Sequence, residues 1–203
     1  MLDEWLGQRQ GDILKLPRST YRGGVLSIRQ SKTGAGVSLP IDLVPQLAKR
    51  LAGEIARIDA RSAGLPVKPA QLIVDESTGH AYAADPFRHL FAEVRAEAAK
   101  EHPSFQIDYL LPGRAMDDPQ AFTIKMTDLW FMHLRHTAVT RLAEAECEIP
   151  LISAVTGHSP KSVQEILSRY LVRTRKLATL AFQRRLAAES NGYAADRQQD
   201  KAL

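Results

Sequence analysis

The sequence predicts a mainly helical α+β domain, with a helical core and a small antiparallel sheet near the N-terminus. Apolar residues recur at helical spacing through residues 41–58 and through most of residues 134–189. Between residues 25 and 40, two β-prone runs flank a glycine-containing turn, which is typical of a β-hairpin. The 203 residues are enough for one well-cored domain, or at most two small ones.

The N-terminal elements follow from local patterns. Apolar side chains within residues 3–16 predict one short helix, which Pro17 ends because proline cannot continue it. We expect antiparallel strands over residues 25–30 and 37–40, joined by a turn that carries Lys32.

The middle of the chain predicts two further helices. A long amphipathic helix should begin at Ile41, because apolar side chains then repeat every three or four residues. Residues 71–82 indicate a short strand and a turn. Asp85 and Pro86 fit the cap and first position of a second helix, which we expect to reach about Lys100.

Residues 102–126 contain three prolines and little periodicity, so they predict a long loop. From about Leu134 the pattern becomes strongly helical. Gly157 is expected to end one of these helices, and Ser159 and Pro160 to begin the next.

The charge distribution fits a polyanionic partner without requiring one. The net charge is +4, and residues 135–185 hold nine Lys or Arg against four Asp or Glu. The single cysteine, Cys147, excludes an internal disulfide framework and a cysteine-based zinc site. No apolar run is long enough to span a membrane, and the N-terminus does not read as a signal peptide, so we expect a cytoplasmic protein.

A set of polar residues would suit attack on a phosphodiester. Two guanidiniums can clamp its non-bridging oxygens and stabilise the charge that develops there. A tyrosine, whose free pKa is about 10, needs cationic neighbours or a base to become a nucleophile, and a lysine in a turn can protonate the leaving oxygen. Such a site needs no metal or cofactor. The candidates are Arg9, Lys32, Arg135, His158 and Tyr170.

Three segments carrying these residues resemble the tyrosine recombinase (phage integrase) family. GQRQGDILKL, at residues 7–16, resembles its first arginine box, with Asp12 as the acidic residue that supports the arginine. VLSIRQSKTGAGVSLP, at residues 25–40, resembles its lysine-bearing hairpin. LRHTAVTRLAEAECEIPLISAVTGHSPKSVQEILSRYL, at residues 134–171, resembles the second arginine box, the Gly-His box and the nucleophile helix. The resemblance runs from about residue 7 to 181, and its last third is the most specific.

This resemblance implies a role for each candidate. Arg9 and Arg135 would bind the scissile phosphate, and His158 would donate a hydrogen bond to it. Lys32 would protonate the leaving 5′-hydroxyl, while Tyr170 would form a covalent 3′-phosphotyrosine link. Another 5′-hydroxyl would then rejoin the strand, without ATP, because the ester is retained.

The resemblance also implies a domain organisation and partners. Residues 1–188 would form a catalytic domain without the first helices of the family's domain, followed by a flexible tail at 189–203. The partner would be double-stranded DNA. Tetramers would assemble on it through the helix predicted at residues 174–189, which could instead pack within its own chain.

One position departs from the family pattern. The second box usually reads His-x-x-Arg, but Met132 stands three residues before Arg135, and a thioether is a poor proton acceptor. His133 is displaced by one residue, about 100° of helical rotation. It would substitute for the missing histidine only if the backbone there is extended rather than helical.

Two alternatives to an active recombinase therefore stay open. A catalytically inactive prophage integrase remnant would keep the fold and lose turnover. Residues 140–167 also fit a helix-turn-helix regulator, which would bind DNA without cutting it. A regulator, however, has no use for Tyr170 or Lys32.

Overall fold

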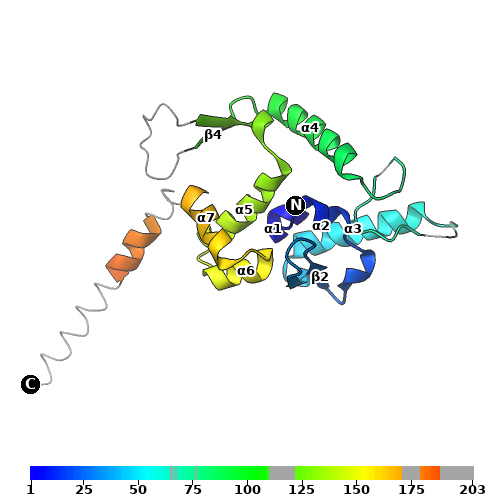
Figure 1. Ribbon diagram of the computed structural model, residues 1–203, viewed down its shortest axis with the longest axis horizontal. Coiled ribbons are helices and arrows are strands. Elements are labelled where there is room, and N and C mark those ends of the chain that lie inside the picture. The colour runs from blue at the N-terminus through cyan, green and yellow to red at the C-terminus, as the bar shows by residue number, and fades with distance from the viewer. Residues whose placement is uncertain (65, 67, 76, 110–121, 171–178, 188–203) are drawn as a thin grey trace, which may run out of the picture. The chain divides into compact units, whose positions relative to one another are not determined.

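The computed structural model divides the chain into two units, Met1–Tyr170 and Leu171–Leu203. The residues that it describes are 1–64, 66, 68–75, 77–109, 122–170 and 179–187 (Figure 1). Side chains are not described for 106–109, 122–123 and 169–170. In the second unit residues 179–187 are helical, and the tail predicted at 189–203 lies outside the described residues.

The first residues form two short helices, α1 (Leu2–Leu6) and α2 (Gln10–Leu14), so the prediction of one helix over residues 3–16 was wrong. Gly7 ends α1 in the left-handed conformation, with φ 58°. Arg9 then adopts an extended conformation as the residue before α2. The break leaves the Arg9 side chain at a helix start rather than on a helix surface.

The predicted hairpin is confirmed and gains a third strand. β1 (Tyr21–Arg22), β2 (Val25–Arg29) and β3 (Gly36–Pro40) form an antiparallel sheet in that order, with Ile28 opposite Val37. A short 3-10 turn, η1 (Arg18–Thr20), precedes it. Alternate residues of β2 and β3 are buried, so one face of the sheet packs on the core.

The long helix α3 (Pro45–Arg61) follows a 3-10 turn, η2 (Ile41–Leu43), and thus starts later than predicted. It lies in one core cluster with the buried face of the sheet. Residues 71–82 make two isolated bridges instead of the predicted strand. The buried members of the cluster are Leu6, Leu16, Leu26, Ile28, Val37, Leu39, Ile41, Leu47, Leu51 and Leu72.

The helix α4 (Ala84–Glu101) begins slightly before the predicted Asp85 cap, and none of its side chains is buried. It is attached through aromatic edge contacts to Phe131 and a hydrogen bond from Arg95 to Leu129 O. The predicted loop at 102–126 contains an antiparallel pair, β4 (Gln106–Tyr109) and β5 (Phe122–Lys125). These strands have four residues each, so the alternation of apolar and polar residues in them is too short to tell them from a loop by sequence.

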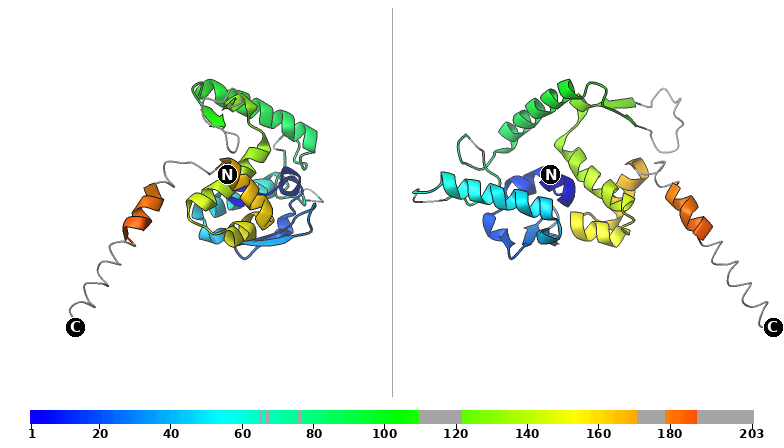
Figure 2. Two further views of the ribbon diagram at one scale, coloured as in Figure 1. Left: turned by 60° about the vertical axis from the view of Figure 1, so that its left-hand side comes forward. Right: turned by 180° about the vertical axis from the view of Figure 1, so that it is seen from behind.

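The C-terminal part of the first unit is helical, as predicted. The 3-10 turn η3 (Met126–Asp128) leads to α5 (Phe131–Glu144), α6 (Ile149–Thr156) and α7 (Pro160–Tyr170), which pack together (Figure 2). Gly157 ends α6 with φ 64°, and the Ser159 hydroxyl accepts a hydrogen bond from Ser162 N, as expected for a helix start. The buried residues of this second cluster are Val139, Ile152, Val163 and Ile166.

The two core clusters meet where α1 packs on α5 and α6 packs on β3. Close approach of α1 requires a glycine, because a Cβ on Gly7 would lie 2.9 Å from Ala138 Cβ and 3.0 Å from Thr156 Cγ2. In the described part of the chain, no helix is both long and apolar enough to cross a membrane.

Gly7→Ala is expected to lower the free energy of unfolding by about 2 kcal/mol or more, because it adds both a left-handed strain and a steric clash. Urea denaturation of the purified protein measures this change. Gly11→Ala is the control, because Gly11 lies in α2 with open space around it and should gain up to about 1 kcal/mol. Equal effects of the two substitutions would contradict the proposed packing of α1.

Candidate active site at the junction of the two cores

Arg9 lies at the junction, held by the start of α2 and by the hairpin. Its Nη1 donates a hydrogen bond to Gln30 Oε1 (3.0 Å) and lies 3.8 Å from Asp12 Oδ2. Asp12 is buried, and its Oδ1 accepts a hydrogen bond from Ser31 N (3.0 Å). Asp12 therefore lies beside Arg9 and ties the hairpin turn to α2, while its role in supporting Arg9 during a reaction stays a prediction.

Arg135 enters the same junction from the second turn of α5, and it is only 7% exposed. Its Nε donates to His158 Nε2 (2.9 Å), and its Nη1 donates to Gly7 O. Its buried Nη2 has no hydrogen-bond partner among the described residues. Burial, and then the charge of Arg9, lower the pKa of Arg135 to about 10, so the guanidinium stays charged at neutral pH.

His158 follows Gly157 and orients Arg135. Because Nε2 accepts from Arg135, the ring proton is assigned to Nδ1, which lies 2.9 Å from Thr156 Oγ1. The Thr156 hydroxyl in turn donates to Ile152 O (2.7 Å), which leaves it free to accept. Burial first, and then the charges of Arg135 and the neighbouring cations, lower the pKa of His158 to about 3, so the imidazole is neutral at pH 7.

Two predicted residues lie on the elements expected for them. Lys32 is exposed in the turn between β2 and β3, and it makes no hydrogen bond or ion pair among the described residues. Tyr170 is the last residue of α7, but its side chain lies outside the described part of the structure. The structure thus brings Arg9, Arg135 and His158 together. That the side chains of Lys32 and Tyr170 reach the same place stays a prediction.

The residues before Arg135 are helical, so the condition set for His133 is not met. Met132 lies in the first turn of α5 and is 56% exposed. His133 Nδ1 accepts a hydrogen bond from Trp130 N (2.9 Å), which caps the helix. Its ring lines a mostly apolar hollow of about 310 Å³ beside Leu134. The substitution of His133 for the missing histidine stays a prediction that this geometry does not favour.

Three buried polar residues at the junction were missed by the sequence analysis. Gln8 and Gln30 are fully buried and join the hairpin to the end of α6. Asp3, on α1, is 4% exposed, and neither carboxylate oxygen has a hydrogen-bond partner among the described residues. Burial raises the pKa of Asp3 to about 7, while the nearby charge of Arg135 opposes the rise. Local sequence carries no signal for these contacts, because their partners are distant in the chain.

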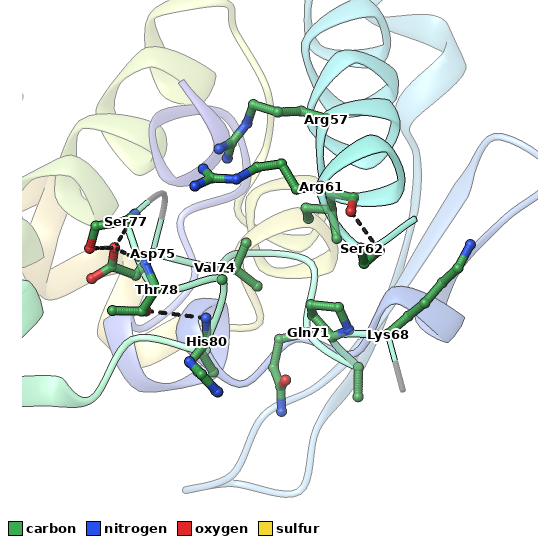
Figure 3. A pocket seen from close by; sticks show the side chains of 15 residues that line it. Arg57, Arg61, Ser62, Lys68, Gln71, Val74, Asp75, Ser77, Thr78 and His80 are labelled. Carbon is green, nitrogen blue, oxygen red and sulfur yellow. Dashed lines mark hydrogen bonds between the residues drawn. The ribbon is translucent and has the colours of Figure 1, made fainter. Parts of the chain in front are cut away.

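A larger hollow of about 560 Å³ lies elsewhere, between the end of α3 and residues 68–81 (Figure 3). Its wall includes Arg57, Arg61, Lys68 and His80, but none of the predicted site residues. Arg57 and Lys68 already pair with Glu54 and Asp59. Among the described residues no cluster of histidine, cysteine or carboxylate side chains could hold a metal ion.

Comparison with solved structures identifies the fold as that of the tyrosine recombinases. The XerA recombinase matches 90% of this chain over 55% of its own, with a TM-score of 0.58 and 16% identity. A lambda integrase dimer bound to a COC′ core site matches 85% of this chain over 52% of its own (TM-score 0.53, 17% identity). The Tn1549 transposon integrase in complex with a circular intermediate DNA matches 90% over 56% (TM-score 0.55, 18% identity).

The chain therefore spans about half the length of these structures. No protein-family model matches the sequence, and no curated protein matches it. The likeness, at 16–18% identity, concerns the fold, which the sequence had predicted correctly as mainly helical with a small antiparallel sheet.

Asp3→Asn is expected to raise the free energy of unfolding at pH 8 by about 2–4 kcal/mol. The folded carboxyl has a pKa of about 7 against 3.8 for the ordinary group, so its protonated form is favoured by folding. Its contribution is fully present below about pH 4 and is lost as the pH rises through 7. Urea denaturation between pH 4 and 8.5 should show this fall as the difference in stability between the wild type and the variant, because the lowered pKa of His158 makes both proteins more stable as the pH rises toward 6.5. Glu93→Gln, at an exposed position of α4, should leave the slope unchanged.

Proposed function

We propose that this chain cleaves and rejoins double-stranded DNA at specific sites through a 3′-phosphotyrosine intermediate on Tyr170. The observation that carries the proposal is the meeting of two guanidiniums from separate cores beside a neutral histidine. Arg9 and Arg135 are close enough for the charge of one to lower the pKa of the other. The fold is shared with recombinases, including the DNA-bound lambda and Tn1549 integrases.

The site would work mainly by electrostatic stabilisation. The non-bridging oxygens of the scissile phosphate would accept hydrogen bonds from Arg9 and from the unpartnered Nη2 of Arg135. The Tyr170 hydroxyl would lose its proton to water as its oxygen attacks phosphorus, and the bond between phosphorus and the 5′-oxygen would break as Lys32 gives that oxygen a proton. Attack by another 5′-hydroxyl on the phosphotyrosine would rejoin a strand and restore the tyrosine.

The hydrogen bond that His158 accepts from Arg135 supports a role other than the one implied by the resemblance. Donation to the phosphate requires a proton on Nε2, whereas that atom accepts a hydrogen bond from Arg135. With its pKa lowered to about 3, the ring does not gain a second proton near neutral pH. In this state His158 would act on the phosphate through Arg135, by holding its guanidinium in place.

A second candidate is an inactive integrase remnant that still binds DNA. It is favoured by Met132, since an exposed thioether in the first turn of α5 cannot accept a proton from Tyr170. The helix-turn-helix regulator considered above would leave the convergence of Arg9, Arg135 and His158 without a purpose.

Assembly on DNA through the C-terminal helix is also a proposal. In the described part of the second unit, Phe182 and Leu186 lie one helical turn apart and are 66% and 65% exposed. Lambda integrase forms a dimer on its core site and a tetramer on a Holliday junction.

Phe182→Ser with Leu186→Ser should reduce the oligomers seen by sedimentation on DNA, whereas Gln183→Ser should not. Unchanged oligomers would remove this helix from the proposal.

A nicked suicide substrate provides the direct test of cleavage. Wild-type protein should form a covalent DNA adduct on denaturing gels, and Tyr170→Phe should abolish it. Arg9→Ala and Arg135→Ala should each slow adduct formation about 100-fold or more, because each removes a donor to the developing charge. Tyr21→Phe is the matched control, because Tyr21 lies in β1.

The same assay separates the two candidate functions. DNA binding without an adduct, together with an adduct in Met132→His, would indicate an inactive remnant. An adduct that survives Tyr170→Phe would contradict the assignment of the nucleophile.

A further inference from the structure

Gln30 is fully buried and directly follows β2, at the start of the turn that carries Lys32. Its Oε1 accepts hydrogen bonds from Arg9 Nη1 (3.0 Å) and Thr33 Oγ1 (3.1 Å). Its Nε2 donates to Gln8 Oε1 (2.8 Å) and to Thr156 O (2.9 Å). Because a guanidinium can only donate and a carbonyl can only accept, the orientation of the amide is fixed by its partners.

Each of these partners adjoins a residue of the proposed reaction. Arg9 itself would bind the phosphate, and Gln8 precedes it. Thr33 follows Lys32, and Thr156 lies two residues before His158. The Gln30 side chain thus contacts three separate segments of the chain, which are residues 8–9, the turn at Thr33 and the end of α6 at Thr156.

The backbone around Gln30 holds the turn as well. Gln30 N donates to Ala35 O (2.8 Å), and Gly34 N donates to Gln30 O (2.8 Å), which closes the turn. Ser31 N donates to Asp12 Oδ1, which fixes the turn to α2. The position of the turn is therefore defined relative to Arg9, although Lys32 itself is exposed.

Gly157 allows this arrangement. A Cβ at Gly157 would overlap the Gln30 amide, so the glycine is required there by a contact from the hairpin as well as by its positive φ. The amide consequently packs directly against the residue that precedes His158.

The bond between Thr33 and Gln30 is not needed to satisfy a buried hydroxyl. Thr33 is exposed, so water could replace Gln30 as the partner of its hydroxyl, and the bond adds little to stability. Its clear consequence is that it fixes the turn that bears Lys32 to the amide that holds Arg9.

We propose that Gln30 is a positioning residue that holds the Lys32 turn and the Arg9 guanidinium in one rigid frame before DNA binds. This inference rests on the proposed function. It predicts that loss of the link to the turn impairs proton donation by Lys32, while phosphate binding by Arg9 is retained.

The test compares two suicide substrates, one with the normal 5′-oxygen and one with sulfur at that bridging position. A thiol has a pKa of about 8.5, so a sulfur leaving group departs without a proton donor. Thr33→Val keeps the shape of the side chain and removes only the hydroxyl. It should slow adduct formation about 3- to 10-fold on the oxygen substrate, as expected for loss of a hydroxyl that donates to Gln30 Oε1 and accepts a longer hydrogen bond from Ala35 N (3.4 Å), and less than about 2-fold on the sulfur substrate.

Further variants define the pattern. Thr33→Ser retains the hydroxyl and should react like the wild type. Lys32→Ala should show the same substrate dependence as Thr33→Val, but more strongly. Gln30→Met should slow both substrates, because Arg9 also loses its partner. Thr20→Val is the control, because Thr20 is a partly buried threonine whose hydroxyl donates to Pro17 O and does not contact Gln30. Equal slowing of both substrates by Thr33→Val, or no slowing at all, would overturn the inference.

Hydrogen exchange keeps the two proposals distinguishable. Gln30→Met and Thr33→Val should speed exchange at the amides of Ser31 and Gly34, while those of Leu26 and Leu39 in the strands stay protected. Unchanged exchange at the turn would overturn the positioning role even if the wild type forms an adduct. A wild type without adduct on either substrate would instead overturn the proposed function.

Discussion

The charge of Arg135 is buried between two cores, and the surrounding residues are arranged around it. A guanidinium removed from water is strongly unfavourable unless its N–H groups find acceptors. Gly7 O and His158 Nε2 supply two of these acceptors, one from each side of the junction. The left-handed Gly7, the break between α1 and α2, and the αL end of α6 all serve to present these atoms.

The described residues neutralise the positive charge of Arg135 only in part. Arg135 Nη2 has no acceptor and Arg9 adds a second positive charge nearby, while Asp3, whose pKa is raised to about 7, is only partly charged at neutral pH. An anion at this place would relieve the repulsion between the guanidiniums and occupy the free nitrogen. This arrangement of charges favours an anionic ligand, which is consistent with the phosphodiester substrate proposed above.

Much of the fold could be predicted because its signals are local. The hairpin over residues 25–40 and the end of α6 at Gly157 follow from alternation and from glycine at a helix terminus. The helix predicted over residues 3–16 failed because Gly7 ends α1, and its close contact with Ala138 is not visible in the sequence. The β4–β5 pair was missed because four-residue strands carry too little pattern.

The sequence by itself determined the order of Arg9, Arg135 and His158, together with the elements on which they lie. Only the tertiary structure decided that Arg135 binds Gly7 O, 128 residues away, and that Gln30 binds Thr156 O, 126 residues away. It also decided that His158 accepts from Arg135. Local spacing specifies helices and strands, whereas these contacts depend on how two separately packed cores meet, which no short stretch of sequence encodes.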